Sequence, residues 1–448
     1  MRGRGSLWRG NTEDMARIEE CVIYRDFQDG GLLARMNRLL ETVSEKYFFA
    51  EEKEELCSIC NELVELASMY GFHGNLWHNY VTWLLVNHEN AFSIAAEIRG
   101  AVEGSLYELA LRDFEILKEL YDADLLLLDK KTGVSLFKIL ADYKGQDEGS
   151  RMISQRIRDR ICSLSVELSE ASDVKGFTES LLRFYKDFGV GKLGLHKAFR
   201  VEHDEKGKVQ IVPIKRTAHV QLQDLVGYEL AKKKLTDNTE AFVRGRKANN
   251  CLLFGDAGTG KSSSIKGILN QYYEEGLRII ELYKNQFADL NDVVAQIKNR
   301  NYRFIIYMDD LSFEEFETDY KYLKAVIEGG LEKKPDNVLI YATSNRRNLV
   351  RERAGDKLEL SDEDDLHSSE TVQEKLSLVY RFGVRIYFGK PDKKEFQNIV
   401  RVLAERNGIR MDEKKLFLLA NQWELSNGGL TGRTAQQFID YLLGTGTE

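Results

Sequence analysis

The segment from residue 255 to residue 262 has the composition and spacing of a phosphate-binding loop. It reads Gly-Asp-Ala-Gly-Thr-Gly-Lys-Ser and fits the pattern G-x-x-x-x-G-K-S/T at every defined position. Glycines allow a tight turn whose backbone N–H groups point at a phosphate, and a following helix adds its positive N-terminal end. Lys261 is expected to reach the β- and γ-phosphates, and the Ser262 hydroxyl to bind Mg²⁺. The predicted nucleotide-contacting residues of this segment are Gly255, Asp256, Ala257, Gly258, Thr259, Gly260, Lys261, Ser262 and Ser263.

Two consecutive carboxylates follow the apolar run at residues 304–308. A buried strand in that run would deliver both to its C-terminal end, the edge of an open α/β sheet at which ligands bind. Asp309 is expected to hold Mg²⁺ through water, because carboxylate oxygens are hard ligands that suit this ion. Asp310 is the candidate base that orients the attacking water. The two motifs together predict a site for a nucleotide and its metal.

The elements that position these residues are predicted by alternating strand and helix patterns from residue 224 onward. The candidate strands are 250–254, 277–281, 304–308, 338–342 and 384–388, with helical patterns such as 262–275 and 289–300 between them. Such alternation indicates βαβ units and a parallel sheet covered on both faces, which is the α/β class. After Pro391 the strands stop, and 393–407, 413–421 and 431–443 are predicted to be helices.

The first part of the chain has a different pattern. From residue 32 to about 185 apolar residues recur at helical spacing, which predicts a mainly α-helical N-terminal domain. Residues 199–202 and 208–214 are a predicted hairpin within a joint. We therefore expect an N-terminal domain at 1–186, a linker at 187–219, a nucleotide-binding core at 220–391 and a helical subdomain at 392–448. Residues 352–370 are polar and acidic and are expected to form a mobile loop.

Beyond the two phosphate motifs, the chain resembles the AAA+ ATPases in four further segments. Residues 224–227 resemble the segment that enters the core and packs near the adenine, which implies Val226 and Gly227 as nucleotide contacts. Residues 342–345 resemble the sensor 1 region, with Asn345 near the γ-phosphate.

The other two segments imply two arginines. Residues 380–383 resemble the arginine-finger region, with Arg381 at the finger position, and 429–433 resemble sensor 2, with Arg433 facing the γ-phosphate. More closely, the runs 309–314, 342–347 and 432–435 resemble an uncharacterised bacterial family of AAA+-type ATP-binding proteins. The resemblance covers roughly residues 220–448.

This resemblance implies an AAA+ P-loop core with a helical lid, ATP and Mg²⁺ as cofactors, and ATP hydrolysis. The implied catalytic residues are Lys261, Asp310, Asn345, Arg381 and Arg433. Arg381 would act in trans in a homo-oligomer, either a ring such as a hexamer or a filament, and can contribute on the order of 10³–10⁵ in rate. One departure concerns Asp310, because most AAA+ proteins have glutamate there. Water is then held differently, or Glu314 assists, or turnover is slow.

Three functions compete. The first is an oligomeric remodelling or regulatory ATPase whose N-terminal domain binds an unknown protein partner. The second is a nucleotide-gated binding module with slow hydrolysis, which the shorter Asp310 favours. The third is a DNA-associated loader or initiator; nucleic acid is less favoured as a partner because the net charge is −8. A small-molecule kinase is a distant fourth, because it has no place for Arg381 and Arg433.

Composition limits the remaining choices. Of the 448 residues, 43% are hydrophobic and 30% charged, as in soluble globular proteins, and the apolar runs are too short to cross a membrane. The cysteine count is odd, at 5, which favours reduced thiols in a cytoplasmic protein.

Two motifs are weaker. Cys57, Cys60, His73 and His78 have zinc-finger spacing, but the helical pattern at 51–70 runs through both cysteines and favours ordinary thiols. Residues 189–194 fit G-x-G-x-x-G, yet they follow a predicted helix and precede a strand, which favours a joint over a dinucleotide site.

Overall fold

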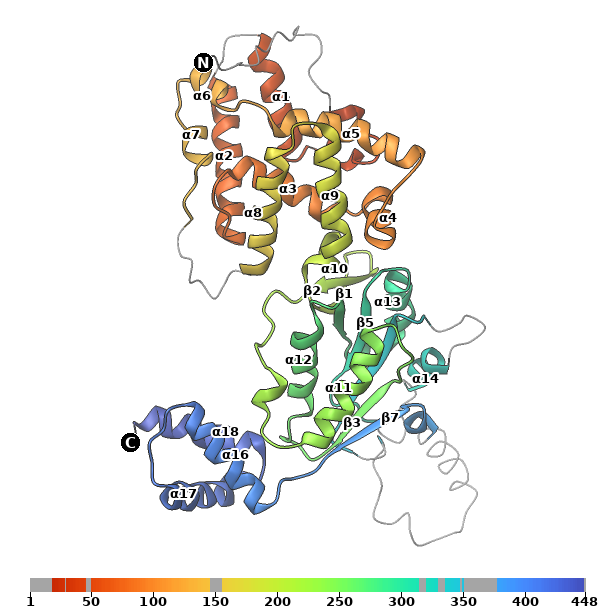
Figure 1. Ribbon diagram of the computed structural model, residues 1–448, viewed down its shortest axis with the longest axis vertical. Helices are drawn as coiled ribbons and strands as arrows, with labels where there is room; N and C mark the ends of the chain where they lie inside the picture. Colours follow the sequence, from red (N-terminus) through yellow and green to blue (C-terminus); the bar gives the residue numbers. More distant parts are fainter. Residues whose placement is uncertain are drawn as a thin grey trace. The chain divides into compact units, whose positions relative to one another are not determined.

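The computed structural model describes residues 18–28, 30–45, 50–145, 155–313, 320–328, 335–346, 349 and 377–446. The chain divides after Leu195 into two compact units (Figure 1). Among the described helices, none combines the length and the apolar character needed to cross a membrane. Glu314 and the acidic segment 352–370 lie outside the described residues.

The N-terminal unit is built from helices, as its periodicity predicts. Its large apolar side chains, such as Trp77, Phe114 and Phe177, are buried in one cluster. The elements are η1 (Ile18–Glu20), η2 (Arg25–Gln28), α1 (Leu32–Glu45), α2 (Ala50–Tyr70), α3 (Leu76–Asn87), α4 (Ala91–Arg99), α5 (Ser105–Tyr121), α6 (Leu126–Thr132), α7 (Phe137–Leu140), α8 (Gln155–Glu170), α9 (Val174–Phe188) and α10 (Gly191–Leu195). This unit therefore has its own core.

The second unit is organised around a seven-stranded sheet in the order β2-β1-β4-β5-β6-β3-β7. β1 and β2 pair antiparallel, and the other neighbours pair parallel. The strands are β1 (Ala198–His203), β2 (Val209–Pro213), β3 (Cys251–Gly255), β4 (Leu277–Glu281), β5 (Arg303–Met308), β6 (Val338–Ser344) and β7 (Val384–Phe388). The predicted α/β class with a parallel sheet is confirmed.

The β1–β2 hairpin differs from its prediction as part of a separate linker. β1 pairs parallel with β4, with Ala198 opposite Ile279 in the register, so the hairpin forms one edge of the sheet. Phe199 and Val201 of β1 are buried. Burial of these side chains favours a place in the sheet over one in an exposed connection.

Helices α11 and α12 pack on one face of the sheet. Leu235 of α11 and Ile265 of α12 share a buried cluster with Leu253 of β3 and Ile305 of β5. In the described part of this unit, the helices outside the lid include η3 (Leu222–Asp224), α11 (Glu229–Val243), α12 (Lys261–Tyr272), η4 (Lys284–Asp289), α13 (Leu290–Ile297) and α14 (Tyr320–Glu328). Because β3 ends at Gly255 and α12 begins at Lys261, the loop between them lies at the C-terminal end of the parallel strands.

A three-helix subdomain, the lid, follows β7. It consists of α16 (Lys393–Arg406), α17 (Glu413–Ser426) and α18 (Gly432–Thr445), as predicted. Phe396, Ala420 and Phe438 contribute one side chain from each helix to its core. Asp392 caps α16 and Thr431 caps α18 through side-chain oxygens that accept backbone N–H bonds, which explains where these helices begin.

Candidate nucleotide-binding site

The predicted phosphate loop connects the end of β3 to the first turn of α12. Gly258 and Gly260 have φ angles of +75° and +93°, in a backbone region that residues with a side chain rarely adopt. A Cβ atom on Gly260 would lie 2.3 Å from a methyl carbon of Leu225. The loop therefore needs glycine at both positions, and it leaves the N-terminal N–H groups of α12 facing a cavity.

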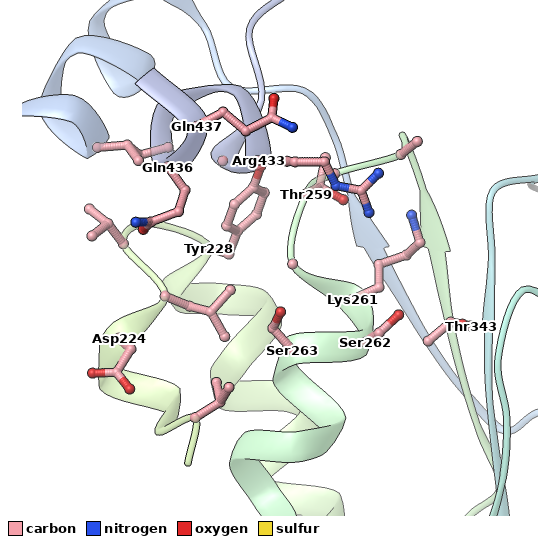
Figure 2. Close-up of a pocket in the computed structure, with 18 of the residues that line it drawn as sticks. Asp224, Tyr228, Thr259, Lys261, Ser262, Ser263, Thr343, Arg433, Gln436 and Gln437 are labelled. Atoms are coloured by element: carbon pink, nitrogen blue, oxygen red, sulfur yellow. The ribbon is translucent and has the colours of Figure 1, made fainter. Parts of the chain in front are cut away.

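The cavity has a volume of about 680 Å³ and lies between the loop, the ends of β5 and β6, and the lid (Figure 2). It is lined by many residues predicted from the sequence, namely Val226, Ala257, Gly258, Thr259, Gly260, Lys261, Ser262, Ser263, Asp309, Asp310, Asn345 and Arg433. Segments more than 200 residues apart in the sequence thus meet at one site, from Val226 to Arg433.

The predicted residues Gly227, Gly255, Asp256 and Arg381 are not among the lining residues. Arg381 is exposed and precedes β7, whereas the other end of β7, at Phe388, pairs with Gly255. At about 3.3 Å per residue, the strand alone separates the two ends by roughly 13 Å. Arg381 therefore lies near the end of the sheet at which the parallel strands begin, opposite to the end that carries the phosphate loop.

Lys261 is buried, with 6% of its surface exposed. Its Nζ donates hydrogen bonds to the carbonyl oxygens of Gly255, at 3.0 Å, and of Asp256, at 2.6 Å. It also donates to Oδ1 of Asn345 at 3.0 Å. Burial lowers the pKa of Lys261, and the nearby carboxylates, Asp256 foremost, only partly oppose that shift.

Asn345 connects the lysine to the candidate base. Its Nδ2 donates to Oδ1 of Asp310 at 2.8 Å. Asp310 has a φ angle of +49°, and its backbone N–H donates to Oγ1 of Thr343 at 3.0 Å. Aspartate and asparagine tolerate this left-handed conformation better than other residues with side chains. The backbone at residue 310 is thus held by β6, and the carboxylate by Asn345.

Three hydroxyl groups donate to one carboxylate oxygen, Oδ1 of Asp309. They belong to Ser262, at 2.9 Å, Tyr307, at 2.7 Å, and Thr343, at 2.5 Å. Burial favours the neutral acid, but these hydrogen bonds outweigh burial and lower the pKa of Asp309. Asp309 is accordingly ionised at neutral pH. The ionised carboxylate beside the Ser262 hydroxyl is a set of hard oxygen donors that fits Mg²⁺.

The lid forms the remaining wall of the cavity. The backbone N–H of Arg433 donates to the carbonyl of Gly258 at 3.2 Å. Figure 2 shows the guanidinium of Arg433 and the ammonium of Lys261 on the same side of the cavity. The first turn of α18 therefore rests directly on the phosphate loop.

Ten lining residues were not predicted individually from the sequence, although some lie in segments assigned to the site: Val220, Asp224, Leu225, Tyr228, Thr343, Ile399, Leu403, Gly432, Gln436 and Gln437. The Tyr228 hydroxyl donates to the carbonyl of Gly389, in the connection between β7 and the lid, at 3.1 Å. Tyr228 directly follows the segment 224–227, and Thr343 lies inside the run 342–345. Both could therefore have been found from the segments that resemble AAA+ proteins. Gln436 carries no comparable signal.

The four residues with zinc-like spacing in the N-terminal unit do not share one element: the two cysteines lie on α2, His78 lies on α3, and His73 lies between the two helices. α2 runs through both Cys57 and Cys60, and Cys57 is exposed whereas Cys60 is buried. Within the described residues, no group of three or more His, Cys, Asp or Glu side chains is arranged to hold a metal ion.

The comparisons with known proteins bear on the second unit. A family model described as "Protein of unknown function (DUF815)" matches residues 194–446. No curated protein matches the chain. The solved structure of the Thermotoga maritima RuvB Holliday junction branch migration motor is 17% identical, with a TM-score of 0.35, over 50% of this chain and 66% of that chain. C. elegans PCH-2 is 17% identical, with a TM-score of 0.32, over 51% of this chain and 65% of that chain.

The chain thus spans slightly less than two thirds of each of these two neighbours. The family model covers more than half of the present chain, including the phosphate loop and the lid. The parallel sheet, the loop between β3 and α12 and the helical lid have the arrangement expected of the AAA+ class. The chain belongs to the DUF815 family, and its second unit has the AAA+ fold.

Proposed function

We propose that this protein binds ATP with Mg²⁺ in the cavity between the phosphate loop and the lid, and hydrolyses it. The proposal rests on one observation above all. Lys261, Asn345 and Asp310 are joined by hydrogen bonds of 3.0 and 2.8 Å beside the N-terminus of α12. A phosphate-binding cation, a polar amide and a carboxylate are thereby collected at the place where a γ-phosphate and an attacking water would meet.

The two sides of the cavity differ in character, which supports a nucleotide as the ligand. Figure 2 shows Lys261 and Ser262 on one side and Tyr228 and Gln436 on the other. The cavity is also lined by aliphatic side chains of the core and the lid, namely Val220, Leu225, Val226, Ile399 and Leu403. The cationic side suits phosphates, and the aromatic and aliphatic groups suit a base. Phosphate oxygens would replace the carbonyl groups that now accept from Lys261.

Ser262 and Asp309 would hold Mg²⁺, and a bound Mg²⁺ would neutralise charge on the phosphates. Asp309 is kept ionised by its three hydroxyl donors, as this role requires. Asp310 would orient the attacking water and accept its proton, and Asn345 would hold the carboxylate of Asp310 in place. Arg433 of the lid would contact the γ-phosphate.

We further propose that Arg381 completes the site of a neighbouring subunit in a homo-oligomer. Its place at the opposite end of the sheet from its own phosphate loop supports action in trans. The N-terminal unit, which has a separate core, would bind a protein partner that the ATPase unit remodels or regulates. Sedimentation with and without a non-hydrolysable ATP analogue tests the assembly, and a monomer under both conditions would contradict it.

A direct test of the proposed activity combines calorimetric titration of ATP with a phosphate-release assay. The wild type should bind ATP, bind it more tightly when Mg²⁺ is present, and release phosphate. A wild type that neither binds ATP nor releases phosphate would exclude this function. GTP, which differs from ATP only in its base, is the comparison ligand that tests whether the base side of the cavity distinguishes the two nucleotides.

A second function, a nucleotide-gated binding module with slow hydrolysis, is favoured by one observation. Asp310 is shorter than glutamate, and its carboxylate is held by Asn345. Tight ATP binding with turnover close to the uncatalysed background would favour this module over a remodelling ATPase. Turnover well above background in the wild type would exclude it.

A further inference from the structure

Tyr307 lies on β5, two residues before Asp309, which directly follows the strand. Its hydroxyl donates to Oδ1 of Asp309 at 2.7 Å. The sequence analysis places this tyrosine in the apolar run 304–308, where only its hydrophobic character matters and the hydroxyl has no assigned role. The position nevertheless carries the one hydroxyl on β5 that contacts the candidate metal ligand.

The ring of Tyr307 is fixed by packing. Only 5% of its surface is exposed, and it belongs to the buried cluster that also contains Ile265 of α12 and Tyr341 of β6. A buried aromatic side chain between a sheet and a helix has few alternative rotamers. The hydroxyl therefore has a well-defined position, and it shares its acceptor, Oδ1 of Asp309, with the hydroxyl of Ser262 in the first turn of α12.

The three donors to Oδ1 of Asp309 would respond differently to a bound metal ion. Ser262 is itself a proposed Mg²⁺ ligand, so its hydroxyl oxygen would turn to the ion. Tyr307 and Thr343 are not proposed ligands, and they remain available to the carboxylate. Hydrogen bonds from hydroxyls to an ionised carboxylate are short and strong, and they fix its orientation.

We propose that Tyr307 is a positioning residue for Mg²⁺ binding: its buried hydroxyl holds the carboxylate of Asp309 in the orientation that serves the metal. This inference rests on the proposed function, because it assigns a support to the metal site of that function. It predicts that removal of the Tyr307 hydroxyl weakens Mg²⁺ binding and leaves the contacts with the nucleotide unchanged.

Tyr307→Phe is the appropriate variant, because it removes the hydroxyl and keeps the ring. Tyr341→Phe is the matched control. Tyr341 is buried in the same cluster, but its hydroxyl is bonded to Asn238 and Thr239 of α11, at 2.9 and 3.0 Å, and it does not line the cavity. Both variants lose one buried hydroxyl, and only one of them faces Asp309.

The measurement is the Mg²⁺ concentration at which binding of a fluorescent, non-hydrolysable ATP analogue reaches half of its Mg²⁺-dependent increase. Mn²⁺ binding to the same complex, followed by electron paramagnetic resonance, gives a second readout that does not involve turnover. Tyr307→Phe should raise the half-saturating concentration of either ion about 10-fold, as loss of a group supporting a metal ligand typically does. Binding of the analogue in chelator should stay at the wild-type level.

Equal metal dependence in Tyr307→Phe and Tyr341→Phe would overturn the inference. So would a loss of analogue binding in chelator that matches the loss in Mg²⁺, because that result would indicate a structural role. A wild type whose nucleotide binding does not respond to Mg²⁺ would contradict the proposed function itself. The two failures are therefore distinguishable.

Discussion

The Nζ of Lys261 donates to Oδ1 of Asn345 across 3.0 Å, which joins the phosphate loop to the end of β6. The amide nitrogen of the same asparagine donates to Asp310. One side chain thus contacts both the proposed phosphate-binding cation and the proposed base. In the proposed function, a γ-phosphate that draws Lys261 away from Asn345 would alter the support of Asp310.

Asn345→Ala should therefore lower turnover more than ATP affinity. The variant removes the amide that orients Asp310, and loss of one such oriented group typically lowers kcat by about 10²-fold. Steady-state kcat and KM for ATP are the measurements. Asn407→Ala, at an exposed position after α16, is the control and should behave as the wild type. An unchanged kcat in Asn345→Ala would argue against this role.

Two substitutions at Asp310 separate chemistry from backbone conformation. Asp310→Asn suits the φ angle of +49°, because asparagine tolerates the left-handed region, but it cannot accept a proton. It should keep ATP affinity and the melting temperature, while phosphate release falls by about 10²- to 10⁴-fold. Full activity in this variant would exclude Asp310 as the base.

Asp310→Glu introduces the residue usual in AAA+ proteins, but glutamate is disfavoured at this φ angle. The strain should cost about 1 kcal/mol and lower the melting temperature of the second unit by about 2–4 °C. Differential scanning calorimetry with Asp310→Asn as the reference measures this cost. A melting temperature at or above that of the wild type would show that the backbone at residue 310 adapts to glutamate.

Much of this site was predictable because its signals are local. The apolar run 304–308 became β5, since a parallel strand covered on both faces needs a continuous apolar sequence. The phosphate loop was predictable because its glycines and lysine are adjacent in the chain. Asn345 and Arg433 required the resemblance to AAA+ proteins, because a single asparagine or arginine carries no signal of its own.

Other features depend on contacts between distant segments. β1 pairs with β4 across more than 70 residues of sequence, and nothing local distinguishes it from a free hairpin strand. The role of the Tyr307 hydroxyl depends on its hydrogen bond to Asp309, the carboxylate to which Thr343 also donates. The left-handed conformation of Asp310 arises in the same way, from the hydrogen bond of its N–H to β6. The pattern of residue types cannot reveal such pairings.

Arg381→Ala should reduce turnover by about 10³- to 10⁵-fold without weakening ATP binding, because the arginine would act on a neighbour's nucleotide. Its exposure means that the fold should tolerate the change. Arg385→Ala, at an exposed position on β7, is the matched control. Phosphate release and analogue binding are measured for both.

Mixing subunits tests whether Arg381 acts in trans. Arg381→Ala subunits bind ATP but lack the finger, whereas Lys261→Ala subunits keep the finger and lack the phosphate contact. A mixture of the two should recover phosphate release that neither has alone. A mixture as inactive as its components would contradict a shared site.

Asp256 contacts the connection between β7 and the lid, although it does not line the cavity. Its Oδ2 accepts from the backbone N–H of Lys390 at 3.1 Å. Asp256→Ala should destabilise the second unit by about 0.5–1.5 kcal/mol and lower its melting temperature by a few degrees. Asp256→Asn retains an acceptor oxygen and should lose less. Equal losses in the two variants would mean that the hydrogen bond to Lys390 contributes little.

The most direct test of the account is phosphate release from ATP by the wild type and by Lys261→Ala. The control is Lys266→Ala, five residues further along α12 at an exposed position. The account predicts that the wild type and Lys266→Ala bind and hydrolyse ATP, and that Lys261→Ala does neither while its circular dichroism and melting temperature stay close to the wild type. Hydrolysis by Lys261→Ala at the wild-type rate would contradict the account.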